Sequence, residues 1–98
     1  MERSAVEVAP HVYRALFEND RVRLLEVRMK PGDASEIHAH PDVLVHVLQG
    51  GTIRWTPPSG ESAEVELVAG STFWSDAQEH SAENSGDTEF VGLFVEFK

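Results

Sequence analysis

The stretch GDASEIHAHPDVLVHVLQG, residues 32–50, decides how this chain folds. His38 and His40 lie two residues apart near the end of a predicted strand. Side chains at that spacing point to the same face of a strand, with their Cα atoms about 6.5–7 Å apart. Both imidazoles can therefore converge on one small object, such as a metal ion or a proton-accepting ligand. Pro41 ends the strand, because its fixed φ and missing N–H suit a turn or a strand edge.

The composition indicates one acidic domain and argues against nucleic acid and membranes as its partners. A chain of 98 residues is expected to form a single domain, and its 41% apolar residues argue against disorder. The formal net charge of −9 argues against nucleic acid and anionic membrane surfaces as partners, because a phosphate surface requires a basic face.

The chain has no cysteine, which excludes disulfides, a thiolate nucleophile and thiolate metal ligands. Small secreted domains often carry disulfides. Residues 1–13 also lack the apolar segment of a signal peptide. No apolar run approaches the roughly 20 residues that a membrane-spanning helix needs. We therefore expect a cytoplasmic protein.

Short strand patterns separated by turn residues predict an all-β sandwich or barrel. Residues 1–11 are expected to form a loose lead-in, and residues 12–98 a single domain. No segment carries a sustained helical period, and residues 76–79 are expected to form a loop leading to His80. The predicted strands cover residues 12–17, 21–30, the stretch up to His40, and residues 43–48, 52–56, 62–68, 71–75 and 89–97.

Two segments match the motifs of a known family. The pattern Gly-x5-His-x-His-x(3,4)-Glu-x6-Gly is met at Gly32, His38, His40 and Gly50. The pattern Gly-x5-Pro-x-Gly-x2-His-x3-Asn is met at Gly70, His80 and Asn84, with one residue fewer between its glycine and its histidine. These are the two cupin motifs, in the usual order, and the chain resembles cupins from residue 12 to residue 97.

The resemblance implies a jelly-roll β-barrel, the double-stranded β-helix of RmlC-like cupins, with one metal ion inside. It implies that His38, His40 and His80 are the metal ligands and that Asn84 supports a turn. Cupins also commonly pair through edge strands, so the resemblance implies a homodimer. The first strand, residues 12–17, or the closing strand, residues 89–97, would cross to the neighbour.

The chain departs from both motifs. The glutamate of the first motif falls on Val43 when counted from Gly50, and on Leu44 when counted from the next glycine. Neither side chain can bind a metal ion. In the second motif, Ser75 or Asp76 stands where proline is expected, and alanine replaces the following glycine. The metal ligands implied by the resemblance therefore number three.

Three neutral imidazoles suit one divalent transition metal ion, which we expect to be Fe, Ni, Zn, Mn or Cu. The site lacks the hard oxygen ligands that Ca²⁺ and Mg²⁺ prefer. Without a carboxylate ligand the ion keeps its full charge and is a stronger Lewis acid. Three protein ligands also leave open positions, as catalytic metal sites do.

Further candidates lie close to the three histidines in sequence. His46 is the candidate catalytic group, and it enters the barrel if Leu44 and Leu48 face inward; both parities of this strand are apolar, so the direction stays open. Asp42 can reach the site from its loop or remain a solvated turn residue. The expected pocket residues are Trp74, Val43, Leu44 and Asp42.

Three functions are compatible with this sequence. The first, which we predict, is a metalloenzyme of the dioxygenase, isomerase or lyase type that acts on a small organic acid or keto compound. The second is a non-catalytic barrel that binds or senses a small ligand. The third is a structural unit whose site has decayed, which the missing glutamate favours. Fold alone does not choose among them, because one fold supports many chemistries.

Overall fold

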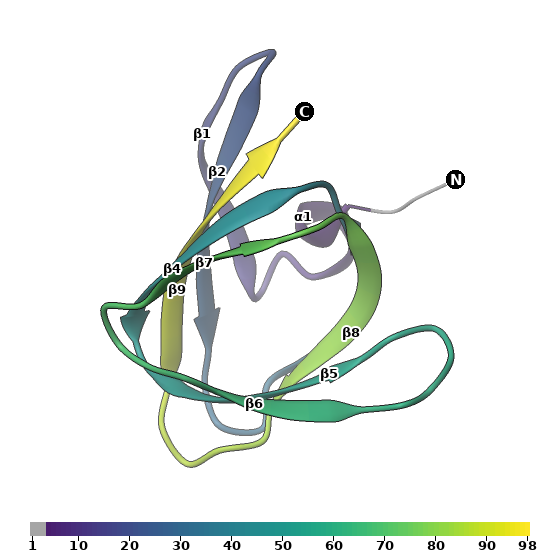
Figure 1. Ribbon diagram of the computed structural model, residues 1–98, viewed down its shortest axis with the longest axis vertical. Coiled ribbons are helices and arrows are strands. Elements are labelled where there is room, and N and C mark those ends of the chain that lie inside the picture. The colour runs from purple at the N-terminus through teal and green to yellow at the C-terminus, as the bar shows by residue number, and fades with distance from the viewer. Residues whose placement is uncertain (1–3) are drawn as a thin grey trace.

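The computed structural model describes residues 4–98, which form nine β-strands and one short helix. Two antiparallel sheets face each other around a common interior (Figure 1). The elements in chain order are α1 (Ala5–Val8), β1 (Tyr13–Glu18), β2 (Val22–Met29), β3 (Ala34–His40), β4 (Val43–Gln49), β5 (Gly51–Thr56), β6 (Ala63–Leu67), β7 (Thr72–Ser75), β8 (Gln78–Asn84) and β9 (Phe90–Phe97).

The strand order is that of a jelly roll, so the all-β prediction is confirmed. One sheet has the order β1-β2-β9-β4-β7 and the other the order β3-β8-β5-β6. The last strand, β9, therefore lies between β2 and β4, although both precede it by many residues. Such long-range antiparallel pairing closes the chain into a barrel and leaves few exposed edges.

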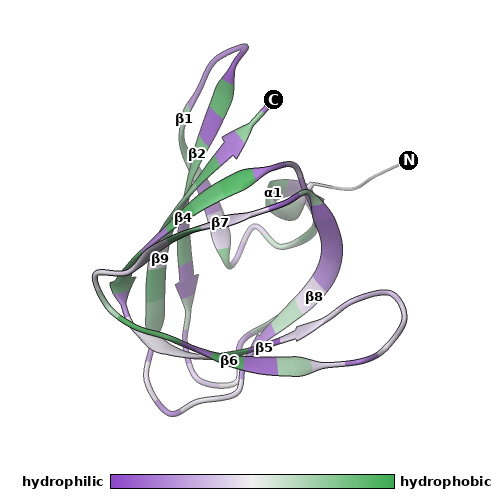
Figure 2. Cartoon of the chain, viewed as in Figure 1, coloured by the Kyte–Doolittle hydropathy of each residue, from purple (hydrophilic) through white to green (hydrophobic). Residues whose placement is uncertain are grey.

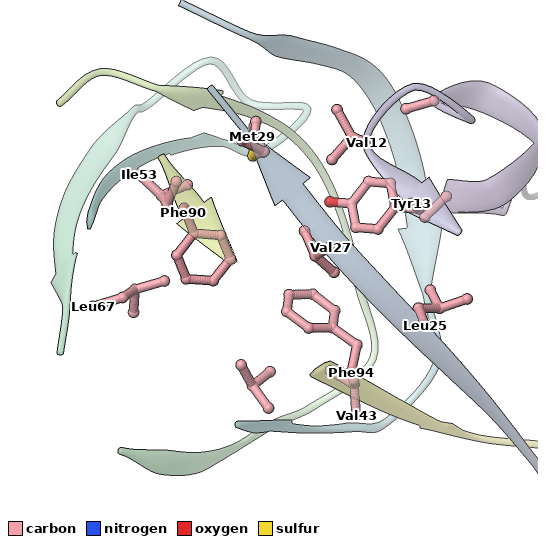
Figure 3. Close-up of a cluster of buried hydrophobic side chains, with 14 of the residues drawn as sticks. Val12, Tyr13, Leu25, Val27, Met29, Val43, Ile53, Leu67, Phe90 and Phe94 are labelled. Carbon is pink, nitrogen blue, oxygen red and sulfur yellow. The ribbon is translucent and has the colours of Figure 1, made fainter. Parts of the chain in front are cut away.

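The core lies between the sheets and is built from alternate residues of each strand. On β2 these are Leu25, Val27 and Met29, which are at most 1% exposed. Phe90 and Phe94 of the neighbouring strand β9 extend this apolar face of the same sheet (Figure 3). Apolar residues are concentrated on β4 and β9, as the green segments of Figure 2 show. Alternation with period two thus places one apolar face of each strand inside.

The predicted lead-in contributes to the core. Ala5 and Ala9 are 1% and 0% exposed, and the residue after His38 on β3, Ala39, forms a bridge with Ser4. The Ser4 side chain caps α1 by accepting from the Glu7 backbone N–H. Residues 4–9 are therefore less loose than predicted, while residues 1–3 of the predicted lead-in lie outside the described part. Within residues 4–98, no helix is long and apolar enough to cross a membrane.

Two predicted segments differ in the structure. Gln78 and Glu79, expected in a loop, already belong to β8, because they pair with His40 and Ala39 of β3. The closing strand is central and paired on both sides, so it cannot cross to a neighbour. The homodimer stays a prediction. The five-stranded sheet has β1 and β7 as its edge strands, and on β1 the side chains of Leu16 and Phe17 are 43% and 56% exposed.

Asn84 ties the end of β8 to the rest of the barrel. Its side-chain NH₂ donates to the carbonyls of Met29 and Thr88, each at 2.8 Å, and its Oδ1 accepts from the Gly86 N–H at 3.0 Å. The residue is 1% exposed. Asn84 therefore supports the turn between β8 and β9, the role that the resemblance implies.

Replacing Asn84 by alanine should lower the free energy of unfolding by about 2–4 kcal/mol, because it leaves partly or fully buried backbone groups without partners. The measurement is urea unfolding followed by circular dichroism. Asn19→Ala is the matched control: Asn19 also accepts two backbone N–H groups, but in the exposed β1–β2 turn where water can replace it. We expect a loss of less than about 1 kcal/mol there. Equal losses in the two variants would contradict this account.

Candidate metal centre

Three buried histidines converge inside the barrel from the neighbouring strands β3 and β8. His38 and His40 are two residues apart on β3 and share its inner face. The antiparallel register of β3 and β8 sets His80 opposite His38. The three side chains are 1%, 3% and 4% exposed for His38, His40 and His80. One ring nitrogen of each lies within 4.8 Å of the others, so the structure brings the three predicted ligands together.

Hydrogen bonds at Nδ1 determine the tautomers of His38 and His40. The Nδ1 of His38 lies 2.8 Å from the carbonyl oxygen of Glu36, which can only accept, so this Nδ1 carries a proton. The Nδ1 of His40 lies 2.6 Å from Oε2 of Glu96 and donates to it in the same way. The Nε2 atoms of the two rings face each other, 3.1 Å apart. Neutral imidazoles are the form that binds a metal ion, and in that form both lone pairs could be joined by one cation.

His80 completes the group, and neither of its buried ring nitrogens has a hydrogen-bond partner within residues 4–98. Buried polar atoms are nearly always paired, so an unpaired imidazole indicates a place for an ion or another ligand. Burial lowers the pKa of His80 to about 3, and repulsion from His40 and His38 acts in the same direction. Burial also lowers the pKa of His38 to about 4. Both rings are thus neutral near pH 7, as metal binding requires.

Glu96 is a buried carboxylate that binds Nδ1 of His40, the ring nitrogen that does not face His38. It comes from β9 of the opposite sheet and is 3% exposed. Arg23 lies 3.8 Å from its other oxygen. A carboxylate bonded to the far nitrogen of a ligating histidine fixes the ring and raises its basicity. The sequence analysis missed Glu96, yet a signal existed: it shares strand parity with the inward-facing Phe90 and Phe94.

Tyr13 is a second site residue that the sequence analysis missed. Its hydroxyl donates to Nε2 of His38 at 3.2 Å. Its ring packs edge-on against His38 and His40, with centroids 5.1 and 5.4 Å away. Burial raises the pKa of the phenol well above its usual value, so the hydroxyl keeps its proton. No pattern in β1 marks this residue, because the rest of the strand is exposed on both faces.

A cavity of about 180 Å³ adjoins His40 and His80. It combines mostly apolar and aromatic walls with a few polar groups, as small-molecule sites do. The other lining residues are Val43, Val45, Trp55, Phe73, Trp74, Ser75, Gln78 and Phe94. A larger depression of about 400 Å³ lies beyond His40 and Glu96, but it reaches only one of the three histidines. The smaller cavity is therefore the candidate binding site.

The other predicted pocket residues fall on different faces. Val43 is 2% exposed and lines the cavity, and Trp74 lines it while remaining 51% exposed. Leu44 points outward. The Asp42 carboxylate accepts from the backbone N–H of Ala77, so it holds the turn before β8 rather than facing the histidines. Of the two positions where the missing glutamate could fall, Val43 is the one that faces the interior.

His46 does not join the three histidines. The inner face of β4 carries Val43, Val45 and Val47, so His46 lies on the outer face with Leu44 and Leu48. There its Nδ1 is 2.7 Å from the hydroxyl of Thr72. The structure thus decides the parity that the sequence left open, and the position of His46 gives no support to a catalytic role inside the barrel.

The residues present fit a transition metal ion. The three converging donors are neutral imidazoles, which suit Zn, Cu, Fe and Ni. One cation could bind the facing Nε2 atoms of His38 and His40 and one of the two unpaired nitrogens of His80. Three protein ligands leave positions for an exogenous ligand, and the cavity lies beside them.

The metal-free protein should lose stability between about pH 6.5 and about pH 4. A histidine in the unfolded chain has a pKa of about 6.5, whereas burial lowers the pKa of His38 to about 4 and that of His80 to about 3. In this range the unfolded state binds protons that the folded state does not. The free energy of unfolding is therefore highest above pH 6.5 and decreases as the pH is lowered. Each of these two histidines contributes up to about 1.4 kcal/mol per pH unit to this decrease in the free energy of unfolding.

Urea unfolding between pH 7 and pH 4.5, after treatment with a chelator, measures this dependence. His80→Leu is the comparison, because it removes one titrating group and an unpaired buried imidazole. The variant should be at least as stable as the wild type at pH 7 and should show a shallower decline in acid. The account fails if both proteins decline with the same slope.

Comparisons with known proteins identify the fold family. No family model matches the chain, and no curated protein matches it. Solved structures do: a cupin domain from Bordetella pertussis Tohama I has 29% sequence identity and a TM-score of 0.80, covering 100% of this chain and 98% of that one. An RmlC-like cupin with a double-stranded β-helix fold from Methanocaldococcus jannaschii has 14% identity and a TM-score of 0.69, covering 88% and 78%.

A third similar structure is the polyketide cyclase RemF from Streptomyces resistomycificus, with 22% identity, a TM-score of 0.62, and coverage of 87% of this chain and 63% of that one. At this identity and at that of the M. jannaschii protein, the likeness shows the fold alone. The B. pertussis domain, in contrast, matches this chain over its full length. From this match, the jelly-roll topology and the buried histidines of both motifs, the chain belongs to the cupin superfamily.

Proposed function

We propose that this protein is a mononuclear metalloenzyme that acts on a small organic acid or keto compound. The observation that carries the proposal is the convergence of three buried imidazoles beside a small cavity. In a protein interior such a group is costly when it binds nothing, because buried nitrogens without partners lose their hydrogen bonds to water.

His38, His40 and His80 would hold the ion through one ring nitrogen each. A divalent transition metal ion bound there would supply Lewis acidity for a carboxylate or keto oxygen. The protein fixes the ligands in advance: the Glu36 carbonyl orients His38, and Glu96 orients His40. Fe, Ni, Zn, Mn and Cu remain the candidate ions.

The cavity limits the substrate to a small molecule. At about 30 Å³ per water molecule, it holds about six water molecules or an organic molecule of similar volume. Its aromatic wall suits an apolar carbon chain, while the two histidines suit an oxygen-bearing end. Gln78 and Ser75, which are hydrogen-bonded to each other at 2.7 Å, are polar groups that can bind a second oxygen.

The lining also restricts the chemistry. Among the described residues that line the cavity there is no carboxylate and no lysine. Orientation and polarisation of the substrate would therefore carry the reaction, with no side-chain general base apart from the histidines themselves. Oxidation by O₂, isomerisation and carbon–carbon or carbon–oxygen lysis are the reaction types that this arrangement supports best.

The same lack of a base favours a second candidate function, a non-catalytic barrel that binds a small ligand through its metal ion. Both functions use the same three histidines and the same cavity. They differ in whether the bound molecule is converted.

Purified protein should take up close to one equivalent of Fe, Ni, Zn, Mn or Cu per chain, measured by elemental analysis after dialysis. His38→Ala should reduce the bound metal at least tenfold, because it removes one of three ligands. His46→Ala is the matched control, since this histidine lies on the outer face of β4, and it should bind metal as the wild type does. Absence of metal uptake in the wild type would refute the metal site.

Metal-loaded protein should convert at least one member of a panel of small 2-oxo acids, hydroxy acids and diketones. Oxygen consumption and proton NMR of the products are the measurements. The turnover should vanish in His80→Leu, which removes a ligand that lines the cavity. Saturable binding without conversion across the panel would instead identify the second candidate, the ligand-binding barrel.

A further inference from the structure

Tyr13 occupies a position in the barrel that its role in packing does not explain. Its backbone N–H donates to the Ala9 carbonyl at 3.0 Å, and it pairs with Val27 across β1 and β2. These contacts hold the side chain inside, where it is 2% exposed. Figure 3 shows its ring beside Val27, with the hydroxyl pointing toward the barrel interior. A buried phenylalanine would pack equally well there, so packing alone does not explain the hydroxyl group of Tyr13.

The hydroxyl of Tyr13 is directed at a ligand atom of the candidate metal centre. It donates a hydrogen bond to Nε2 of His38, at 3.2 Å. That Nε2 is unprotonated, because Nδ1 of the same ring donates to the Glu36 carbonyl. A metal ion bound to this lone pair would take away the acceptor of Tyr13. The phenol would then keep only its hydrogen bond with the Ser35 side chain unless it also bound the ion.

The distances fit a shared ion. Metal–nitrogen bonds of about 2.0–2.1 Å place two neighbouring ligand atoms roughly 2.9–3.4 Å apart, whether the geometry is octahedral or tetrahedral. The Nε2 atoms of His38 and His40 are 3.1 Å apart, and the Tyr13 oxygen is 3.2 Å from the first of them. The Tyr13 oxygen therefore lies about as far from Nε2 of His38 as Nε2 of His40 does, at the separation expected for two ligands of one ion.

The charge balance points the same way. The first cupin motif lacks its glutamate here, and the inward-facing residue at that place is Val43. The three histidines are neutral ligands, so a divalent ion among them would keep its full charge in the barrel interior. An electron-rich oxygen donor from the protein would offset part of that charge.

We propose that Tyr13 is a fourth protein ligand of the metal ion, with its phenol oxygen taking the place of the missing glutamate carboxylate. The inference rests on the three-histidine site of the proposed function. It adds a ligand from β1, a strand of the opposite sheet, to the three from β3 and β8.

Loading the protein with Fe(III), supplied as its citrate complex, tests the proposal by spectroscopy. A phenol oxygen bound to Fe(III) produces an intense charge-transfer band in the visible spectrum, and resonance Raman excitation in that band shows the phenolate ring modes. Tyr13 is the single tyrosine of the chain, so any such signal from the protein identifies it. Tyr13→Phe should abolish the band. It should also weaken the binding of Fe(III) at least as much as the loss of an outer hydrogen-bond partner does, which is about 10–100-fold.

Elemental analysis of the same samples separates the possible results. His46→Ala, on the outer face, should keep both the iron and the band. Wild-type protein that binds one iron without a phenolate band would overturn the role of Tyr13 and leave the three-histidine site intact. Wild-type protein that binds no metal ion, whether Fe(III) or one of the divalent ions, would overturn the proposed function and this inference with it. Unchanged Fe(III) affinity in Tyr13→Phe would also count against coordination by Tyr13.

Discussion

The Nε2 atoms of His38 and His40 lie 3.1 Å apart inside this barrel, and the ring of His80 beside them has no hydrogen-bond partner among residues 4–98. This arrangement opposes folding, because unpaired buried nitrogens lose their bonds to water. It is maintained by the surroundings: the Glu36 carbonyl and the Glu96 carboxylate hold two rings by their far nitrogens, and the β3–β8 ladder holds the third opposite them. A single cation satisfies all three, which is why this cluster is best explained as a binding site.

The two sheets contribute different parts of the centre. The four-stranded sheet supplies the three histidines, while the five-stranded sheet supplies the residues that face them: Glu96 from β9, Val43 from β4 and Tyr13 from β1. The site therefore exists only when the two sheets face each other, in the arrangement drawn in Figure 1. Segment 4–12 takes part in this closure, because Ala5, Ala9 and Val12 are buried and the backbone of Ala9 holds Tyr13.

The loss of the first-motif glutamate changes the electrostatics of the centre without removing acidity from it. A valine at that place leaves the donors neutral, but Glu96 puts a carboxylate directly behind His40. A charge in that position acts through the imidazole, raising its basicity and fixing its direction, and leaves the open side of the site free for a ligand. Arg23, 3.8 Å from Glu96, moderates this charge from the outside.

The sequence by itself determined the strand content, the jelly-roll class and the three histidines. The strand content follows from period-two alternation and from glycine and proline at turns, whereas the jelly-roll class and the three ligands are what the resemblance to the two cupin motifs implies. Even the supporting role of Asn84 followed from its place in the second motif. Local patterns suffice for such features because they depend on neighbours along the chain.

Only the tertiary structure decided which faces point inward and which distant residues meet. Both parities of β4 are apolar, so the outward direction of His46 depended on how β4 packs against β9 and β7. Glu96 and His40 are separated by 56 positions, and Tyr13 and His38 by 25, so no local pattern could pair them. The sequence thus placed the ligands that neighbouring strands share, while the closure of the two sheets chose the residues that support them, because long-range contacts form only when the barrel is complete.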